Sequence, residues 1–319
     1  MNRPEVSIVT SVYRDACLIP RFLEEVEQAM EELLGSCWQE KTEVIFVHDG
    51  GGREEWGLIE AAVKTVTYAR ALDLSRNYGQ HIALICGYKY ARGELVVRLN
   101  LDCQDPPSEI SKLHRNLQEN DHDMVVGLQE KRESSLSDRI TGYVFFKVFN
   151  FLTKSKVPSD TSSLRIMRRR FVEAVCSMGD RDPFLQGLES FCGFSVGYQV
   201  IEHRRRASGR SSYTLFRRCC LAIDASVAYS DRPLRLAVGF GAITCALGII
   251  GVLVQIALYF LDVEFLSGYL SIIALIVVFF GVQTTLTAIV GIYVGKTLLH
   301  AQNRPLFFLK SDTSESYEA

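Results

Sequence analysis

The sequence predicts an α/β domain built on a mostly parallel β-sheet, followed by a two-helix transmembrane hairpin. In the N-terminal part, short apolar runs rich in β-branched residues alternate with helical patterns, and this order favours parallel strands with helices on both faces of the sheet. Nearer the C-terminus, the stretches Leu236–Leu261 and Tyr269–Gly295 contain no charged residue. We therefore assign residues 1–230 to a cytoplasmic α/β domain, 231–300 to the hairpin and 301–319 to a cytoplasmic tail.

The elements of the α/β domain follow one another with short, polar connections. The second strand ends at His48-Asp49-Gly50-Gly51, and the fourth is followed by Asn100-Leu101-Asp102. Polar residues of this kind mark the ends of strands. The expected strands are Val6–Val12, Glu43–Val47, Thr67–Leu74, Leu95–Leu99 and Met124–Gly127, and the expected helices are Ile19–Leu34, Gln80–Tyr90 and Ser108–Glu119.

Each uncharged stretch is long enough to cross a membrane, because about 20 apolar residues span a hydrocarbon core of about 30 Å. The alternative is a pair of buried helices in a soluble protein, but such helices usually carry a polar stripe. The connection Asp262–Gly268 is short, so the spans form an antiparallel hairpin. Basic residues flank the hairpin on both sides, and the connection contains only acidic charges, Asp262 and Glu264. This distribution places both ends of the hairpin in the cytoplasm. The basic residues are Arg217, Arg218, Arg232, Arg235, Lys296, Arg304 and Lys310.

Two segments before the hairpin are predicted to be amphipathic helices in the membrane interface. They are Ile140–Thr153 and Tyr213–Tyr229. For the first, a core helix is an equally good interpretation. The polar end of the chain, from Ser311 to Ala319, is expected to be unstructured.

Composition excludes several classes of protein. A net charge of -2 and a pI near 6.3 give no basic field for nucleic acid. The sequence has neither the GxGxxG pattern of dinucleotide enzymes nor the P-loop pattern. The nine cysteines form no CxxC pair and no zinc-like spacing, so they are interpreted as small buried residues of a reducing compartment. The N-terminus lacks the apolar core of a signal peptide.

Two aspartates follow strands of the predicted sheet, and ligands of such sheets bind at the carboxyl ends of the strands. Asp49 follows the second strand and Asp102 the fourth. A single aspartate at a strand end is more often a helix cap or a turn former. The turn after Asp102 also contains Gln104 and Asp105, so it offers several oxygen ligands. This set suits Mg²⁺ or Mn²⁺ bound together with a diphosphate.

Six motifs, in order along the chain, resemble the family 2 glycosyltransferases that transfer a sugar to a polyprenyl phosphate. VSIVTSVYRD resembles an opening strand written with PVYNE, and VIFVHDGG resembles the DDGS motif. LDLSRNYGQHIALICGY contains the LSRNYGQH segment, and LNLDCQDPPSEI resembles DADLQDPPE. RRASGRSSY resembles RxxGxSKY, and GIYVGK followed by NRPLFFL resembles GEYIGR and ARPLY. The resemblance extends from Val6 to about Leu309.

The resemblance implies a GT-A fold, which is Rossmann-like, and an inverting transfer from a nucleotide-sugar to a polyprenyl phosphate for a cell-envelope glycan or glycolipid. It implies that Asp49 contacts the nucleotide base and that Asp102, with Gln104 and Asn100, holds a metal on the diphosphate. Arg206 would bind phosphate. Asp160 would take part in catalysis. The remaining substrate-binding positions implied are Arg76, Asn77, Gln80, Ser163, Arg165, Arg210 and Ser212.

The sequence departs from the family pattern at several of these positions. Asn100 replaces the first aspartate of the DxD pair, and His48 the first of DDGS. The aspartate of the GDFR pattern corresponds to Ser163, and Asp160 lies three residues earlier. The acceptor phosphate is largely dianionic at pH 7, because its second pKa is near 6, so its attack requires no general base. The reaction requires positive charge beside the leaving diphosphate instead.

The supply of arginines fits that need, but for most of them a juxtamembrane patch that binds anionic lipids is the favoured interpretation. Arg206 is the exception because it matches a motif position. The arginines form two clusters, at Arg165, Arg168, Arg169 and Arg170 and at Arg204, Arg205, Arg206, Arg210, Arg217 and Arg218. The leading hypothesis is an inner-membrane enzyme that works with membrane lipids and forms a homo-oligomer. A relative that binds nucleotide-sugar or lipid phosphate without turnover is the alternative. A processive synthase is disfavoured because QxxRW is missing and the spans are too few for a polymer channel. A flippase is disfavoured because two helices enclose no path without oligomerising.

Overall fold

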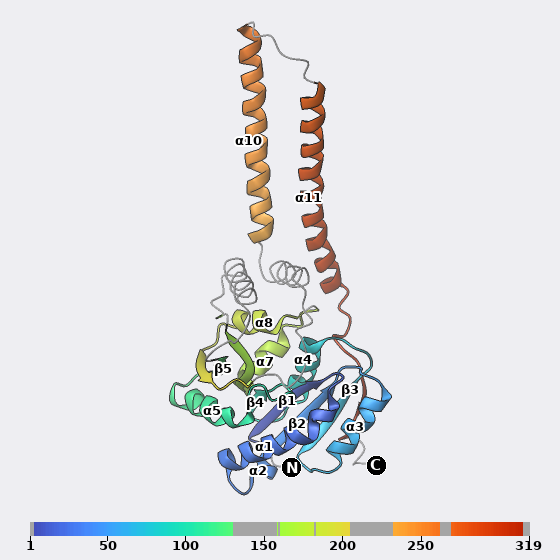
Figure 1. Cartoon of the computed structure of the whole chain (residues 1–319), viewed down its shortest axis with the longest axis vertical. Helices are drawn as coiled ribbons and strands as arrows, with labels where there is room; N and C mark the ends of the chain where they lie inside the picture. Colours follow the sequence, from blue (N-terminus) through green and yellow to red (C-terminus); the bar gives the residue numbers. More distant parts are fainter. Residues whose placement is uncertain are drawn as a thin grey trace. The chain divides into compact units, whose positions relative to one another are not determined.

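The computed structural model describes residues 3–129, 158, 160–181, 183–204, 232–261 and 269–314 (Figure 1). Two compact units are present among them. One holds the α/β domain and the chain from Arg304 onward, and the other holds the two long helices. The predicted helices Ile140–Thr153 and Tyr213–Tyr229 lie outside the described residues, as do Arg206, Arg210 and Ser212.

The α/β unit is built on one sheet with the strand order β7-β5-β6-β4-β1-β2-β3-β8 in the described part of the chain. Strands β1 to β4 are parallel to one another, whereas β6 runs antiparallel to β4 and β5, and β8 antiparallel to β3. β7 is parallel to β5. The strands are β1 (Val6–Val12), β2 (Thr42–His48), β3 (Ala69–Leu74), β4 (Leu95–Arg98), β5 (Met124–Gln129), β6 (Thr161–Arg168), β7 (Val196–Ile201) and β8 (Leu309–Asp312).

Helices cover both faces of the sheet. The main apolar core joins one face to α1, α3 and α5, and α4 and α7 pack on the opposite face. In β1, Ile8 belongs to the main core and Val9 points to the other face, as the two-residue period of a strand requires. The helices are α1 (Ile19–Leu34), α2 (Trp38–Lys41), α3 (Arg53–Val63), α4 (Gln80–Tyr90), α5 (Ile110–Glu119), α7 (Arg169–Ser177) and α8 (Leu185–Phe191), with short 3-10 turns at Ala16–Leu18 and Pro107–Glu109.

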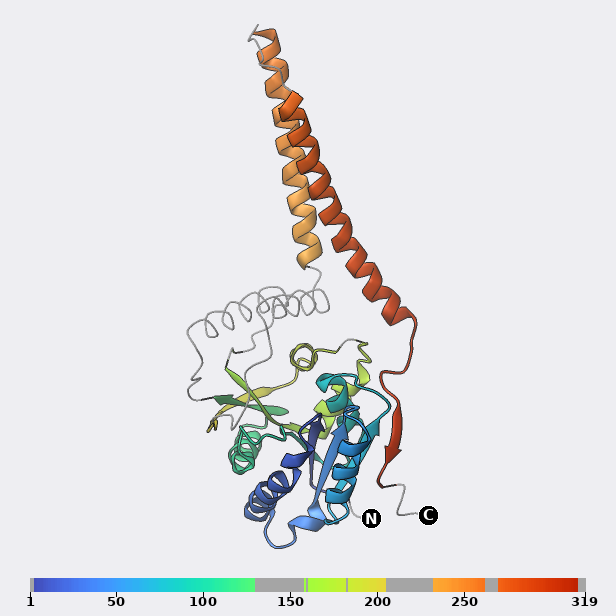
Figure 2. The ribbon, with the colours of Figure 1, turned by 45° about the vertical axis from the view of Figure 1, so that its right-hand side comes forward.

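All five expected strands and all three expected helices are present, with ends that move by a few residues at most. The predicted mostly parallel sheet is confirmed. The unstructured C-terminal end is wrong for Ser311 and Asp312, because these residues belong to β8 at the edge of the sheet (Figure 2). β8 has too few apolar residues to be recognised from its sequence, and its pairing with β3 provides the order.

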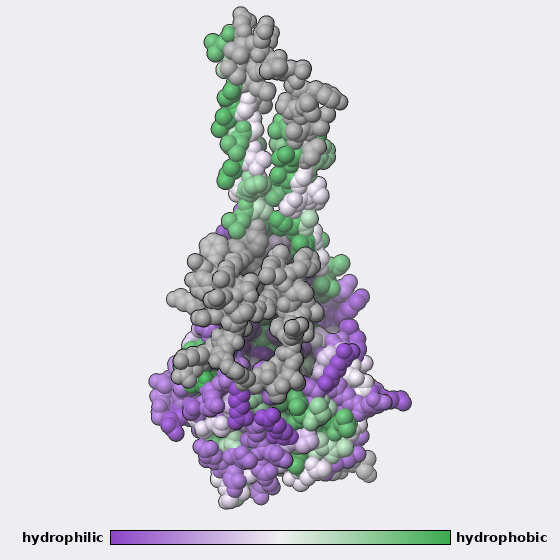
Figure 3. Space-filling model, in the orientation of Figure 1, coloured by the Kyte–Doolittle hydropathy of each residue, from purple (hydrophilic) through white to green (hydrophobic). Residues whose placement is uncertain are grey.

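The second unit contains α10 (Arg232–Phe260) and α11 (Tyr269–Ala301). Their windows Leu234–Gly251 and Val278–Ala301 are apolar enough to cross a membrane and are not buried by protein. Figure 3 shows apolar residues on their described surface. Such exposed apolar helices are stable in lipid rather than in water, so this unit associates with a membrane.

The packing of α4 on β1 depends on Gly87. A Cβ at this position would collide with Cγ1 of Val9 and approach Cγ2 of Val47 to 3.2 Å. We expect Gly87→Ala to lower the stability of the α/β unit by about 1–3 kcal/mol, because the contact is already filled. A thermal melt of the full chain in detergent measures this.

Gly57→Ala is the matched control, because no atom lies within 4 Å of a Cβ at Gly57 on α3. This change should leave the melting temperature unchanged or raise it, since alanine favours a helix by about 1 kcal/mol over glycine. Equal effects of the two substitutions would contradict the packing described for α4.

Candidate functional site

The carboxyl ends of the parallel strands lie side by side. In the register of the sheet, Val12 of β1 pairs with His48 of β2, and His48 pairs with Asp73 of β3. Val9 in the middle of β1 pairs with Arg98 at the end of β4, so the turn after β4 begins beside the second half of β1. The turns that follow β2, β3 and β4 therefore meet at one edge of the sheet, which we call the carboxyl edge.

Asp49 is buried and organises the turn that follows β3. Its Oδ1 accepts a hydrogen bond from the amide of Tyr78 at 2.7 Å, and its Oδ2 accepts one from the amide of Gly79 at 2.9 Å. Its backbone carbonyl accepts a hydrogen bond from Nδ2 of Asn77 at 3.0 Å. Burial raises the pKa of Asp49, while the hydrogen bonds from the amides of Tyr78 and Gly79 oppose the shift. In this structure Asp49 holds the loop Ser75–Gly79, and the predicted contact with a base remains a prediction.

The loop Ser75–Gly79 is also held by contacts of its own. The guanidinium of Arg76 lies over the ring of Tyr78, 4.3 Å from its centre, and the Tyr78 hydroxyl lies 3.0 Å from Oγ of Ser75. Gly50 has a φ of 71°, and a Cβ there would collide with the backbone of Arg76 and Asn77. Only glycine fits this close approach of two turns.

The turn after β4 brings Asn100, Asp102 and Gln104 together. Oδ1 of Asp102 accepts a hydrogen bond from the amide of Gln104 at 3.3 Å. Oδ1 of Asn100 accepts one from Nε2 of Gln80 at 3.3 Å, so the first residue of α4 lies beside this turn. Cys103 has a φ of 48°, which closes the turn. Four of the residues predicted as ligands or substrate contacts are therefore neighbours at the carboxyl edge.

Carboxylates that the sequence analysis did not single out lie near Asp102. The pKa of Asp15 is raised to about 6, mainly by burial and also by the charges of Glu55 and Asp102. The hydrogen bond from the amide of Tyr13 lowers this pKa and opposes part of the shift. Glu55 is buried, and its Oε1 accepts hydrogen bonds from the amides of Asp15 and Ala16 at 2.9 and 3.3 Å. Asp15 belongs to the VTSVYRD motif, and its position just after β1 could have identified it.

This cluster of negative charge fits a divalent cation. Repulsion among Asp15, Glu55 and Asp102 would be relieved by a cation, and the carboxylate and amide oxygens of Asp102, Asn100 and Gln104 are ligands that Mg²⁺ and Mn²⁺ prefer. No group of three His, Cys, Asp or Glu side chains among the described residues is placed to hold a metal by itself. A cation here would therefore need oxygen ligands from a bound substrate, such as those of a diphosphate.

Asp105 connects the carboxyl edge to β6 and β7. It is buried, and its Oδ2 accepts hydrogen bonds from the hydroxyls of Ser162 and Ser163 at 2.5 and 2.7 Å. Its Oδ1 lies 2.8 Å from Nδ1 of His203. Burial would raise the pKa of Asp105, but the hydrogen bonds from Ser162, His203 and Ser163 lower it below its usual value. Ser163, predicted to bind substrate, uses its hydroxyl on Asp105.

Arg165 and Asp160 occupy different surroundings. Arg165 is 1% exposed, forms an ion pair with Glu189 and is paired across strands with Arg98. Asp160 is exposed, and its carbonyl accepts a hydrogen bond from the amide of Gln129 at 3.0 Å.

Burial lowers the pKa of His81 to about 3, helped by the charges of Arg98 and Arg165, so His81 is neutral at physiological pH.

The chain is similar in sequence to known glycosyltransferases. Residues 7–176 match the profile of the family described as Glycosyl transferase family 2. The chain is 26% identical over 313 residues to the uncharacterized glycosyltransferase YkcC of Bacillus subtilis, with 96% of this chain and 93% of that protein covered. It is 27% identical over 309 residues to an undecaprenyl-phosphate 4-deoxy-4-formamido-L-arabinose transferase of Photorhabdus laumondii, with the same coverage.

A solved structure shares the fold of the α/β unit. It is the mannosyltransferase PcManGT from Pyrobaculum calidifontis in complex with GDP-Man and Mn²⁺, with a TM-score of 0.50 and 17% sequence identity. The match covers 72% of this chain and 64% of that one. The fold class predicted from the sequence is thus confirmed.

The raised pKa of Asp15 predicts a pH dependence of stability. Its native pKa lies above the value of 3.8 for a free side chain, so the native state holds the proton more tightly and loses stability as pH rises from about 4 to 6. Asp15→Asn removes this loss while keeping an oxygen for the Tyr13 amide. The melting temperature of the variant, minus that of the wild type, should therefore increase between pH 4 and 7. A difference that is constant over this range would contradict the assignment.

Asn100 predicts the strength of metal binding. Asn100→Asp adds a charge beside Asp102, so we expect the affinity for Mn²⁺ to increase about tenfold or more, measured by titration calorimetry in the presence of a nucleoside diphosphate. Asn120→Asp makes the same chemical change at an exposed position beyond α5 and serves as the control. An unchanged affinity of the Asn100 variant would mean that this side chain faces away from the cation.

Proposed function

Because the chain belongs to glycosyl transferase family 2, we propose that this glycosyltransferase moves a sugar from a nucleotide-sugar to a polyprenyl phosphate. The observation that carries the proposal is the extent of the match. Relatives named undecaprenyl-phosphate transferases align over 96% of this chain and 93% of their own length, so the alignment includes the hairpin as well as the α/β domain. These relatives are named as transferases, which does not favour the binding-only alternative.

The carboxyl edge is where we place the nucleotide-sugar. The side chains that would hold Mg²⁺ or Mn²⁺ on the diphosphate are Asp102, Asn100 and Gln104. The cation would act as a Lewis acid and stabilise the negative charge of the leaving group. The loop Ser75–Gly79, fixed by Asp49, would lie under the nucleotide with Arg76 and Asn77 toward it. Gln80 would orient Asn100, to which it donates a hydrogen bond.

The acceptor fits the residues that remain. A phosphate monoester is largely dianionic near pH 7 and attacks the anomeric carbon without a base, so the serine at position 163 is compatible with the reaction. Direct attack on the carbon that carries the diphosphate inverts the configuration. Asp160, Arg165, Arg206, Arg210 and Ser212 remain proposed contacts in this step.

The hairpin brings the enzyme to its lipid substrate. α10 and α11 are proposed to cross the inner membrane, with both ends of the chain in the cytoplasm because basic residues flank the helices on that side and Asp262 and Glu264 lie between them. Membrane lipids would surround the helices, and a homo-oligomer packed through them is expected. The polyprenyl chain then stays in the bilayer, and its phosphate is the group that accepts the sugar.

A transfer assay tests the proposal. The full chain in detergent is given undecaprenyl phosphate, Mn²⁺ or Mg²⁺ and a panel of UDP-, GDP- and dTDP-sugars, and lipid-linked sugar is sought by mass spectrometry. A product with the anomeric configuration inverted is expected. Release of free sugar by hydrolysis alone, or transfer of the sugar to a polymer, would contradict the proposed acceptor.

Asp102→Ala should lower transfer at least a thousandfold, about 4 kcal/mol in the barrier, because the cation would lose its charged ligand. The melting temperature should stay close to that of the wild type, since Asp102 is only partly buried. Glu60→Ala, an exposed acid on α3, is the control and should retain full transfer. Full activity of the Asp102 variant would refute the metal site.

A further inference from the structure

The segment that follows α11 returns to the sheet and touches the loops of the carboxyl edge. Its strand β8 pairs with β3, so Leu309 lies opposite Leu74 and Ser311 opposite Asp73. Just before β8, the carbonyl of Phe308 accepts a hydrogen bond from the amide of Ser75 at 2.9 Å. We call Phe307–Thr313 the tail strand. It therefore contacts the first residue of the loop Ser75–Gly79.

A chain of polar groups, exposed at Lys310 and buried at Asp73 and His48, continues from the tail strand to the turn after β2. Nζ of Lys310 lies 3.3 Å from Oδ2 of Asp73, and Oδ1 of Asp73 lies 2.7 Å from Nδ1 of His48. Nε2 of His48 accepts a hydrogen bond from the amide of Gly51 at 2.8 Å. This bond requires a lone pair on Nε2, so Nδ1 carries the proton and donates it to Asp73.

Burial constrains the inner links of this chain, whereas the Lys310 side chain is 58% exposed. His48 and Asp73 are about 2% exposed, so the buried charge of Asp73 needs polar partners, and Lys310 is the cation that reaches it from the surface. If Lys310 is removed, Asp73 keeps only the histidine, and the orientation of the imidazole that fixes Gly51 is less restrained. The turn at Gly51 lies next to Asp49, which holds the loop Ser75–Gly79.

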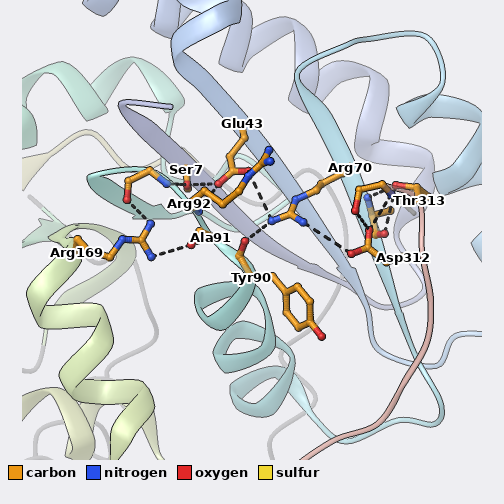
Figure 4. Close-up of polar contacts among 12 residues, drawn as sticks. Ser7, Glu43, Arg70, Tyr90, Ala91, Arg92, Arg169, Asp312 and Thr313 are labelled. Atoms are coloured by element: carbon orange, nitrogen blue, oxygen red, sulfur yellow. Dashed lines mark hydrogen bonds and ion pairs between the residues drawn. The ribbon is translucent and has the colours of Figure 1, made fainter. Parts of the chain in front are cut away.

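The two ends of the tail strand have different roles. At the end away from the carboxyl edge, Oγ1 of Thr313 accepts a hydrogen bond from the amide of Ala71 at 2.9 Å, and Asp312 lies 3.8 Å from Nη1 of Arg70 (Figure 4). Arg70 also contacts Glu43 and the carbonyl of Tyr90. These contacts hold the tail strand on the sheet, whereas Phe308 and Lys310 contact the groups that shape the carboxyl edge.

We propose that Lys310 is a positioning residue for the nucleotide of the donor. Through Asp73 and His48 it fixes the turn at Gly51, and with Phe308 it fixes the loop Ser75–Gly79, so that the segment after the membrane hairpin completes the donor site. The inference rests on the proposed function, since it assumes that the carboxyl edge binds a nucleotide. His48, which replaces an aspartate of the family pattern, is the residue that makes this link possible.

The test is the affinity of the full chain in detergent for UDP and for GDP with Mn²⁺, by titration calorimetry. Lys310→Met should weaken binding of the preferred nucleotide about threefold to tenfold, the effect of one lost charge-assisted contact. Lys310→Arg, which keeps the charge, should restore the affinity to within about twofold. Lys64→Met removes an exposed lysine on the C-terminal side of α3 and should change nothing.

Thr313→Val separates positioning from folding. It removes the hydrogen bond at the far end of the tail strand, so it should lower the melting temperature without changing the affinity for the nucleotide. The inference is overturned if Lys310→Met binds as the wild type does, if arginine fails to restore binding, or if Thr313→Val weakens binding as much as Lys310→Met.

The proposed function is tested separately by the wild type. If the wild-type chain transfers sugar in the assay above and Lys310→Met binds the nucleotide as tightly as the wild type, only the role of Lys310 is refuted. A wild-type chain that binds neither UDP nor GDP refutes the donor site, and the inference with it.

Discussion

Buried carboxylates at the carboxyl edge are the constraint on which the rest of this site depends. A charged oxygen that is removed from water must receive hydrogen bonds or a cation, and the protein supplies these from segments that are distant in sequence. Asp49 accepts hydrogen bonds from amides of the loop after β3. Asp73 contacts His48 and the ammonium group of Lys310. Asp105 accepts hydrogen bonds from two serine hydroxyls and contacts His203. Each carboxylate thereby ties two or more turns together.

This arrangement has a chemical consequence. Asp49, Asp73 and Asp105 shape the site through their hydrogen bonds, and the charge of Asp102 raises the pKa of the nearby Asp15. A divalent cation would offset that negative charge and would also attract the anionic diphosphate. The carboxylates near Asp102 would therefore favour a charged leaving group only through the cation that they hold.

The sequence predicted most of the central sheet and part of the site. β1 to β5, α1 and α4 have apolar periodicity or β-branched runs that reveal them, and the strand-end residues Asp49 and Asp102 were found from their position alone. β8 was missed because LKSD has no apolar pattern and is ordered by β3 and by the contacts of Lys310 and Thr313.

The partners of the buried acids were also beyond the sequence. Ser162, Ser163 and His203 meet Asp105 only because β6 runs antiparallel beside β4 and β7 is parallel to β5. Arg165 was expected to contact substrate. It is buried in an ion pair with Glu189 of α8, and no apolar periodicity in the sequence predicted this helix. Short-range patterns report local structure, but these pairs depend on the order of strands in the sheet.

Hydrogen exchange of the full chain, with and without the nucleoside diphosphate and Mn²⁺, tests the location of the donor site most directly. We expect the amides at 75–80 and 100–104 to be protected when the nucleoside diphosphate binds. A cavity of about 340 Å³ lined by Gln39, Tyr68 and Arg92 lies at the opposite ends of β2 and β3 and should show no change. Protection at that cavity, with the loop Ser75–Gly79 unaffected, would contradict the account.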